Sequence, residues 1–256
     1  RCYFLNWDDL KSDSADVTEK LFSVLEKKTA GSLEKEDKYH ELSFVYFDNF
    51  FFTQQIYLER LFAIVKDSNN YDAIKSMTRL IGEAGKADDY IDYILDKEGH
   101  VHNQHEGHTT HVVSRTTIYT TLAKVQSLLS IEKILTHTFY HTHYEYHDEQ
   151  EEYLNMLKGV FGRASEFIKQ GHTELIGVVE AYYKKAFKEY HRHFDNNNQT
   201  QELLLVFRDC YLTAGLRERG RKAFYERQTE LFDPQKEPSK WEDIRQAYIM
   251  AALWMT

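Results

Sequence analysis

The placement of proline constrains this sequence most. Both prolines, Pro234 and Pro238, fall in one short segment near the end of the 256-residue chain. Proline interrupts helices because it lacks an amide hydrogen and its ring clashes with the preceding turn, and everything before Asp233 is free of it. Apolar residues recur there at three- and four-residue spacing, and no segment alternates convincingly at a two-residue period. The sequence therefore predicts an all-α protein.

Periodicity, together with residues that favour helix starts, places helices along the whole chain. The run Ile118, Leu122, Val125 and Leu129 is an example of the spacing. The chain is long enough to bury one large core or two modest ones. The predicted helices cover residues 15–28, 35–66, 71–84, 88–97, 112–136, 149–169, 173–194, 200–214, 217–232 and 239–255.

The net charge of -9 narrows the possible partners. A negative field repels the phosphate backbones of nucleic acids. The cluster of lysines and arginines that stands apart, Arg217 to Lys222, is expected to be a solvated helix face. Nucleic acid is therefore not an expected partner.

An aromatic run, Phe44 to Leu61, reads FVYFDNFFFTQQIYLERL. Polar residues such as Asp48 and Gln54 interrupt it well short of the roughly twenty apolar residues of a membrane span, so no membrane association is expected. The two cysteines, Cys2 and Cys210, imply no disulfide framework and favour a reducing, cytoplasmic compartment. No signal peptide is expected at the start of the chain.

Glycine-rich stretches and candidate ligand pairs show no catalytic signature. The stretches GEAGKADD and KGVFGR lack the spacing of a phosphate-binding loop, and no paired cysteines form a zinc motif. A di-iron bundle needs two Glu-x-x-His pairs, whereas the nearest match is Asp37 with His40. We therefore expect no enzyme activity and no cofactor.

Histidine is concentrated in the middle of the chain, where GHVHNQHEGHTTH is followed by HTHYEYH at 141–147. Neutral imidazoles at this density can bind zinc, nickel or copper. However, HEGH is one residue short of the zincin pattern, and Gly99 and Gly107 argue against a fixed ligand geometry. We expect a polar, partly disordered insertion, with a metal site as the alternative. The candidate ligands, in one predicted loop, are His100, His102, His105, His108 and His111.

Several short stretches occur in a recognisable order. Upstream lie ELSFVYFDN and VQSLLSIEKIL, and from Tyr153 onward come EYLNMLKGVFGRASEF, EAYYKKAFKEYHRHFD, ELLLVFRDCYLTAG, GRKAFYERQTELFD and AALWMT. In order and approximate spacing, these stretches resemble helices of the 14-3-3 proteins, over about 15–62 and 112–256. The resemblance implies a strongly divergent member of that family. It would be a single domain, 1–256, of about nine antiparallel helices, with an inserted helical and histidine-rich segment at about 66–111.

The resemblance also implies which positions line the family's phosphopeptide groove. The arginine of the fifth helix is retained as Arg163. The family's lysine and arginine of the third helix, its tyrosine and its two asparagines are replaced by Phe47, Gln54, Ala164, Val206 and Met250. Charge-assisted bonds to phosphate contribute roughly 1.5–3 kcal/mol each, so the loss of two cations weakens binding by roughly 3–6 kcal/mol. The phosphoserine or phosphothreonine pocket is expected to be largely lost.

The function that the resemblance implies is that of a non-enzymatic adaptor for protein or peptide partners, unphosphorylated ones included. Phe47 makes a charged groove wall apolar, which suits an amphipathic helix or the inserted segment itself; alternatively, the walls close. One alternative function is a phosphopeptide-binding regulator that uses substitute cations such as Arg208 or Lys158. Another is a His-rich metal-binding helical protein. The short chain before NWDDLK and the insertion weigh against the family-type homodimer.

Overall fold

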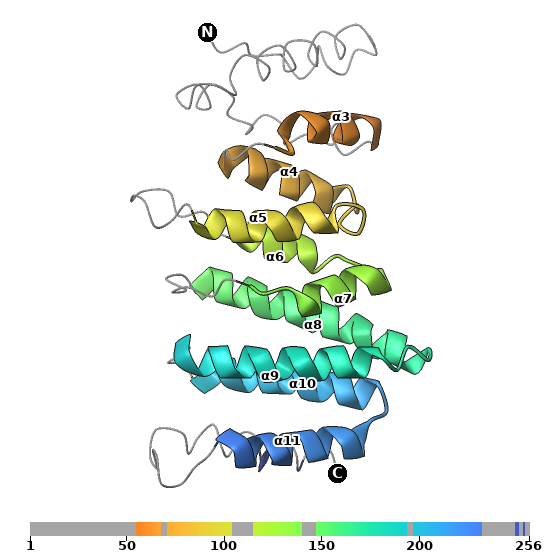
Figure 1. The fold of residues 1–256 in the computed structure, drawn as a ribbon, viewed down its shortest axis with the longest axis vertical. Coiled ribbons are helices and arrows are strands. Elements are labelled where there is room, and N and C mark those ends of the chain that lie inside the picture. The colour runs from red at the N-terminus through yellow and green to blue at the C-terminus, as the bar shows by residue number, and fades with distance from the viewer. Residues whose placement is uncertain are drawn as a thin grey trace, which may run out of the picture. The chain divides into compact units, whose positions relative to one another are not determined.

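A computed structural model describes residues 55–67, 71–103, 115–139, 147–193 and 197–231, together with 249, 250 and 253. This described part consists of helices and short connections and contains no strand, which confirms the predicted all-α fold (Figure 1). Its helices are α3 (Gln55–Val65), α4 (Tyr71–Glu83), α5 (Ile91–Asn103), α6 (Thr116–Leu122), α7 (Leu128–Thr136), α8 (His147–Lys169), α9 (Leu175–His193), α10 (Asn197–Thr213) and α11 (Arg217–Leu231).

Most predicted helices that fall on described residues match the structure closely. The predictions for 71–84, 149–169, 173–194, 200–214 and 217–232 correspond to α4, α8, α9, α10 and α11. The helix predicted at 35–66 is described from its α3 part onward, and α3 ends where expected. The helix predicted at 15–28 lies outside the described residues. Of the one predicted at 239–255, positions 249, 250 and 253 are described, and they are helical.

The helix predicted at 112–136 is in fact two helices, α6 and α7, separated by a turn. Apolar periodicity continues across the turn, so the break comes from hydrogen bonds made by distant residues. The carboxylate of Asp88 accepts from the amides of Gln126 and Ser127, at 2.9 and 3.0 Å. The Ser127 hydroxyl accepts from the amide of Ser130 at 3.1 Å and so caps the first turn of α7.

α5 runs past the end of the helix predicted at 88–97. The extension includes Gly99, and glycine in a helix interior costs about 1 kcal/mol relative to alanine. Tertiary packing outweighs that cost, since residues of the preceding turns such as Ile94 are fully buried. His100 and His102 therefore lie in a helix, not in the predicted loop.

The chain divides into two compact units, Arg1–Ala84 and Gly85–Thr256. In the first unit α3 packs against α4, and buried residues such as Leu61 and Leu80 belong to these two helices. The boundary between the units falls inside the insertion predicted at about 66–111. The single domain implied by the resemblance stays a prediction.

The helices of the second unit pack in two rows. In one row α8 contacts α6 and α10, and in the other α7 contacts α5 and α9 (Figure 1). α8 also contacts α7 and α9, so it connects the rows. Contacts between helices two apart in the chain are typical of helical repeat arrays, in which each helix touches only its near neighbours.

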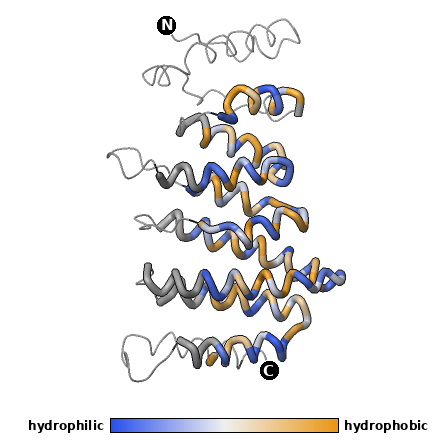
Figure 2. The backbone as a smooth tube through the Cα atoms, in the orientation of Figure 1, coloured by the Kyte–Doolittle hydropathy of each residue, from blue (hydrophilic) through white to orange (hydrophobic). Residues whose placement is uncertain are grey.

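Aromatic side chains fill the space between α8, α9, α10 and α11. The ring of Phe207 stacks on that of Tyr183, with centroids 3.6 Å apart and an angle of 7° between the planes. Phe161, Tyr211 and Phe224 meet Phe207 edge-on, and all five residues are buried. Each such pair contributes about 0.5–1.5 kcal/mol beyond its buried area. Figure 2 shows that hydrophobic and hydrophilic residues alternate along the described parts of these helices.

Two glycines form the turns that reverse the chain in this unit. Gly171, between α8 and α9, has a φ of 110°, and Gly215, between α10 and α11, has a φ of 72°. Glycine adopts these angles without the strain that a Cβ would cause. After Gly215 the amide of Leu216 donates to the carbonyl oxygen of Tyr211 at 2.8 Å, which closes the turn and directs α11 back along α10.

Candidate functional site

Arg163, the groove cation that the resemblance retains, lies on α8 beside the end of α6. Its Nη1 donates to the carbonyl oxygens of Ala123 and Gly159, at 3.0 and 3.3 Å. Its Nε donates to Oε1 of Gln126 at 2.9 Å. Ala123 is the C-cap residue of α6, where helix geometry leaves carbonyl oxygens open, so the guanidinium satisfies an acceptor at that helix end. The side chain holds the turn between α6 and α7 in place.

This arrangement requires a glycine one helical turn before Arg163. A Cβ on Gly159 would lie 3.2 Å from the carbonyl oxygen of Ala123 and 3.3 Å from Nη1 of Arg163. α8 can approach the end of α6 so closely because that side chain is missing. Gly162, by contrast, is exposed, and a Cβ there would meet no atom within 4 Å.

The structure places the substituted groove positions in different surroundings. Ala164 is fully buried in α8, so it lines no surface. Val206 is also buried but borders a pocket. Met250 is 45% exposed and is not among the described residues that line that pocket. Phe47 and Gln54 lie outside the described residues.

The pocket at Val206 lies between α8 and α10 and has a volume of about 340 Å³; we call it the α8–α10 pocket. Leu205 and Val206 give it an apolar wall, and Gly162 leaves its α8 side open. Both substitute cations proposed from the sequence, Lys158 and Arg208, border it. Its lining residues are Lys158, Gly162, Glu202, Leu205, Val206, Arg208, Asp209, Cys210 and Thr213.

Each cation of the α8–α10 pocket stands beside a carboxylate. Nζ of Lys158 lies 3.6 Å from Oε2 of Glu202, and both side chains are about half exposed. Arg208 donates to Oδ1 of Asp209 from Nη2 at 2.6 Å and from Nε at 2.9 Å. The formal charges of the lining residues sum to zero. The exposed pair of Lys158 and Glu202 contributes about 0–1 kcal/mol, so Lys158 is not tightly held, whereas the Arg208 side chain is only 16% exposed.

Cys210 supplies the thiol of this pocket. Burial raises the pKa of the Cys210 thiol to about 11, against the smaller opposing effect of a hydrogen bond with the Ser165 side chain. At neutral pH the thiol is therefore protonated, and the protonated form is a poor nucleophile.

Of the five candidate metal ligands predicted from the sequence, two are among the described residues. His100 and His102 lie two positions apart in α5. His105, His108 and His111 lie outside the described residues. Within the described ranges, no group of three or more His, Cys, Asp or Glu residues is arranged to hold a metal ion.

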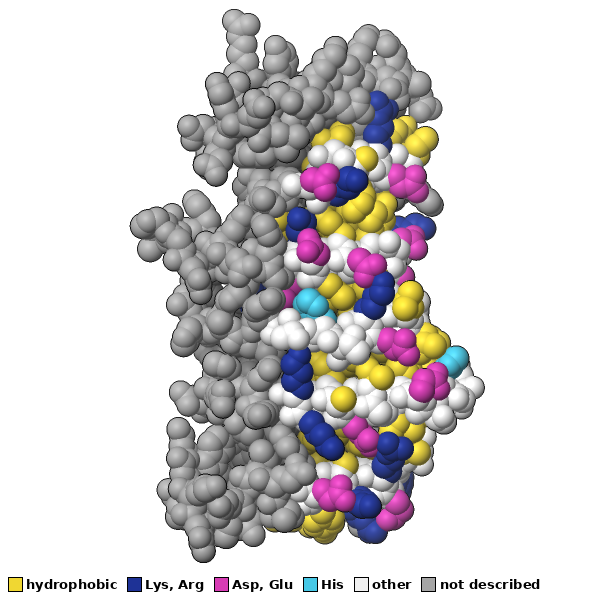
Figure 3. All heavy atoms as spheres, viewed as in Figure 1, with side chains coloured by type: hydrophobic (Ala, Val, Ile, Leu, Met, Phe, Trp, Pro, Cys, Tyr) yellow, Lys and Arg dark blue, Asp and Glu magenta, His cyan; other side chains and the backbone are white. Residues whose placement is uncertain are grey.

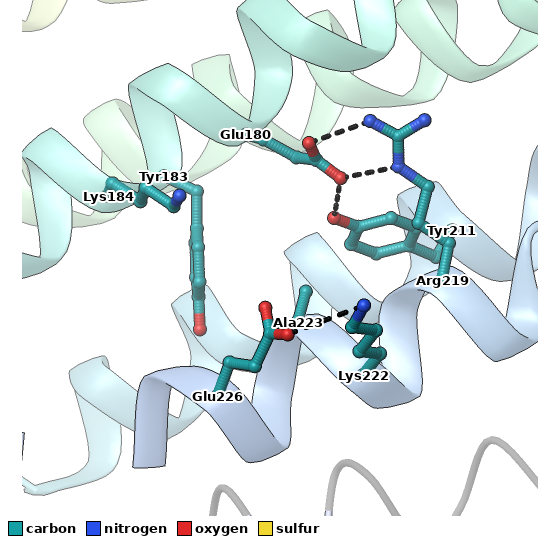
Figure 4. A pocket seen from close by; sticks show the side chains of 8 residues that line it. All are labelled: Glu180, Tyr183, Lys184, Tyr211, Arg219, Lys222, Ala223 and Glu226. Atoms are coloured by element: carbon teal, nitrogen blue, oxygen red, sulfur yellow. Dashed lines mark hydrogen bonds and ion pairs between the residues drawn. The ribbon is translucent and has the colours of Figure 1, made fainter. Parts of the chain in front are cut away.

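A second pocket, of about 220 Å³, lies between α9, α10 and α11; we call it the α9–α11 pocket (Figure 4). Oε1 of Glu180 accepts hydrogen bonds from the Tyr211 hydroxyl and from Nε of Arg219, both at 2.8 Å. Oε2 of Glu180 accepts from Nη2 of Arg219, also at 2.8 Å. The bidentate pair of Arg219 and Glu180 joins α11 to α9, and the Tyr211 hydroxyl joins α10 to the same carboxylate. The lining residues are Glu180, Tyr183, Lys184, Tyr211, Arg219, Lys222, Ala223 and Glu226.

The contacts around Glu180 perturb three titratable groups. Partial burial pushes the pKa of Glu180 upward, but the hydrogen bonds from Arg219 and Tyr211 outweigh it, so this pKa lies below its ordinary value. Burial and the hydrogen bond to Glu180 raise the pKa of Tyr211. The hydrogen bond to Glu180 raises the pKa of Arg219. At neutral pH the cluster therefore holds one fixed negative charge, one fixed positive charge and a neutral phenol.

The sequence predicts a solvated face for Arg217 to Lys222, and Arg219 and Lys222 are indeed exposed while they also line the α9–α11 pocket. A signal for this was present: Arg219, Lys222, Ala223 and Glu226 recur at three- and four-residue spacing and so occupy one face of α11. The sequence does not indicate which other helices lie against this face of α11.

A buried charge cluster joins α5 to the start of α6 and the end of α7. Glu98 is fully buried; its Oε1 lies 3.8 Å from Nη1 of Arg115 and its Oε2 lies 3.3 Å from Nε2 of His137. The Arg115 side chain is 6% exposed. Glu98 and Arg115 stand on either side of the segment 104–114, so they connect its two flanks.

On the face shown in Figure 3, basic and acidic side chains are interspersed over the described residues. That face therefore lacks the one-signed cationic surface that binds nucleic-acid backbones. No helix in the described ranges is long and apolar enough to cross a lipid bilayer.

Comparison with known proteins identifies no relative: no family model, no curated protein and no solved structure matches this chain. The described residues define an all-α protein whose second unit holds two rows of helices and two pockets.

Proposed function

We propose that this chain is a non-enzymatic, cytoplasmic adaptor of the 14-3-3 type that binds unphosphorylated segments of partner proteins. One observation carries the proposal: the guanidinium of Arg163 is engaged by Ala123, Gly159 and Gln126. A cation held by these acceptors is not presented to a phosphate. The phosphate pocket implied by the resemblance then lacks the cation that the sequence had retained.

Recruiting Arg163 to a phosphate would bring little net gain. Hydrogen bonds from a charged donor contribute roughly 1.5–3 kcal/mol, and the carbonyl oxygen of Ala123 would lose its donor when the guanidinium moved. The next residue, Ala164, is buried and has no hydroxyl to add. The energy lost inside the protein is thus similar to the energy that one phosphate contact would supply.

The α8–α10 pocket is the site that we assign to the peptide. Leu205 and Val206 offer an apolar wall, and the formal charges around them cancel. A phosphate dianion would be brought against the carboxylates of Glu202 and Asp209, which is unfavourable. An uncharged aliphatic side chain meets no such repulsion.

A second candidate function is a phosphopeptide-binding regulator that uses substitute cations. The observation that favours it is that Lys158 and Arg208, on different helices, border the same pocket. The negative charges of Glu202 and Asp209 balance the positive charges of these two side chains. Phosphopeptide binding would require those carboxylates to turn away, so Glu202→Gln with Asp209→Asn should strengthen it.

Fluorescence polarisation with the full chain distinguishes the two functions. The probes are a labelled phosphoserine peptide of the type that 14-3-3 proteins bind and the same peptide without phosphate. The adaptor proposal expects no gain in affinity from the phosphate. Tight binding that is lost on dephosphorylation, and also lost in Lys158→Met with Arg208→Met, would establish the phosphopeptide regulator instead.

Unphosphorylated ligands can be selected from a displayed peptide library and then used to test the site. Gly162→Met fills the open side of the α8–α10 pocket without a clash at Cβ. Gly177→Met on α9 is the matched control, because Gly177 is equally exposed and a Cβ there also meets no atom within 4 Å. We expect Gly162→Met to abolish binding of the selected peptides and Gly177→Met to preserve it. Equal binding by both variants would rule out this pocket.

A further inference from the structure

The α9–α11 pocket is positively charged although the whole chain carries a net charge of -9. Three cations line it: Lys184, Arg219 and Lys222. Two carboxylates oppose them: Glu180 and Glu226. These formal charges leave one positive charge in excess. A monoanion neutralises the pocket, whereas a dianion would overcompensate it.

The two carboxylates are held very differently. Glu180 accepts three hydrogen bonds of 2.8 Å and forms a fixed part of the wall. Oε1 of Glu226 lies 3.6 Å from Nζ of Lys222, and these side chains are 62% and 76% exposed. An ion pair four residues apart on a helix surface contributes only about 0.2–0.5 kcal/mol. Lys222 can therefore turn to a ligand at small cost.

The pocket also has an apolar side. Tyr183 is 4% exposed, its ring is fixed by stacking on Phe207, and it lines the pocket together with Ala223. In the view of Figure 4 the Tyr183 ring and the Lys222 amine lie on either side of the Glu226 carboxylate, between α9 and α11. A ligand there would contact an aromatic ring at one end and a cation at the other.

We propose that the α9–α11 pocket binds an organic carboxylate with a short apolar stem. The carboxylate pairs with Lys222, the stem lies against Tyr183 and Ala223, and Lys184 adds to the positive field. Two sources share this chemistry: a free aliphatic carboxylate and the terminal carboxylate of a peptide. The site is separate from the α8–α10 pocket, so this inference does not depend on the adaptor function.

Saturation-transfer NMR of the full chain with hexanoate tests the inference, with hexanamide as the uncharged counterpart. We expect saturable binding of hexanoate and none of hexanamide. Lys222→Met should weaken hexanoate about two- to fivefold, as expected for an exposed ion pair. Lys169→Met changes the net charge equally at an exposed lysine of α8 and should leave the affinity unchanged. Ala223→Leu, which fills the pocket, should abolish binding.

Three results would overturn the inference: no saturable hexanoate binding, equal binding of hexanamide, or equal affinity in Lys222→Met and Lys169→Met. The source of the carboxylate is decided by competition with a peptide that ends in leucine and with its C-terminal amide. Displacement of hexanoate by the free-acid peptide alone supports a protein terminus as the ligand. Retention of hexanoate against both peptides supports a small-molecule carboxylate.

Discussion

Nη1 of Arg163 lies 3.0 Å from the carbonyl oxygen of Ala123, forty positions earlier in the chain. The same guanidinium holds the side chain of Gln126, whose backbone amide donates to the carboxylate of Asp88. The turn between α6 and α7 is thus held from α8 on one side and, on the other, from Asp88 in the segment that precedes α5. These contacts explain the break in the predicted helix, and they hold the Arg163 guanidinium within the fold.

Replacement of Arg163 by methionine tests the contribution of that side chain. The end of α6 would lose its donor, and we expect the free energy of unfolding to fall by about 1–3 kcal/mol. Arg221→Met is the control, because Arg221 makes an exposed pair with Glu218 that contributes about 0–1 kcal/mol. Urea denaturation measures both. Equal stability of the two variants would mean that Arg163 is dispensable to the fold.

Two glycines of α8 should respond oppositely to alanine. Gly162→Ala is expected to stabilise the protein by about 0.5–1 kcal/mol, because alanine favours helix and the new methyl group meets no atom. Gly159→Ala places a methyl group against the Ala123 carbonyl and Arg163, and overpacking of this kind costs about 1–3 kcal/mol. Melting temperatures of the pair provide the comparison. An equal gain in both variants would show that α8 and α6 are not in close contact at Gly159.

The pH dependence of stability tests Asp88. Partial burial pushes the pKa of Asp88 upward, but hydrogen bonds from Ser127, Ser130 and Gln126 outweigh it and hold this pKa below its ordinary value of 3.8. Because the folded-state pKa is the lower one, the carboxylate stabilises the fold above about pH 4, and that contribution is lost as the pH falls through the folded-state value.

Asp88→Asn should therefore be less stable than the wild type at neutral pH, and the gap should narrow below about pH 4. Chemical denaturation of both proteins across this range gives the gap directly. A gap of constant size would show that the charge of Asp88 has no role.

Among the variants described above, a substitution in the buried charge cluster is expected to lower the free energy of unfolding most. Glu98→Ala leaves Arg115 buried without its carboxylate, and removal of one member of a buried pair typically costs about 3–5 kcal/mol. Adding Arg115→Met should recover part of that loss, because it removes the buried positive charge that Glu98 balances. The free energies of the two single variants and the double variant, measured in urea, form a double-mutant cycle. A strictly additive cycle would disprove coupling between Glu98 and Arg115.

Metal binding by the histidine-rich stretch is not expected. Among the described residues no group of three or more His, Cys, Asp or Glu is arranged to hold a metal ion, and Gly99 and Gly107 argue against a fixed ligand geometry. Protein dialysed against a chelator should contain no stoichiometric zinc by elemental analysis. Retained zinc, with a rise in melting temperature that disappears when His105, His108 and His111 are replaced by asparagine, would favour the metal-binding alternative.

Local sequence signals were sufficient for most of the helices. α8 and α10 have regular apolar spacing and are followed by the glycines of their turns, Gly171 and Gly215. The break between α6 and α7 has no comparable signal. Its determinants are Asp88 and Arg163, which bind residues 38 and 40 positions away. Periodicity within a short window cannot report on such partners.

Less of the candidate sites than of the helices could be predicted from the sequence. Lys158 and Arg208 were named from the sequence as substitute cations, and the structure brings both to one pocket. The pairing of Lys158 with Glu202 depends on the packing of α10 beside α8. The α9–α11 pocket was missed because Glu180 and Arg219 are 39 positions apart, and their pairing depends on how α11 folds back.

The pairing of Glu98 with Arg115 has a consequence for how the length of this chain can vary. The two residues hold the flanks of the segment 104–114 together, and α5 and α6 also pack against each other. Doubling the length of such a connection costs only about 0.6 kcal/mol in chain entropy. Insertions or deletions there should leave the melting temperature almost unchanged, whereas a single substitution at either flank should not.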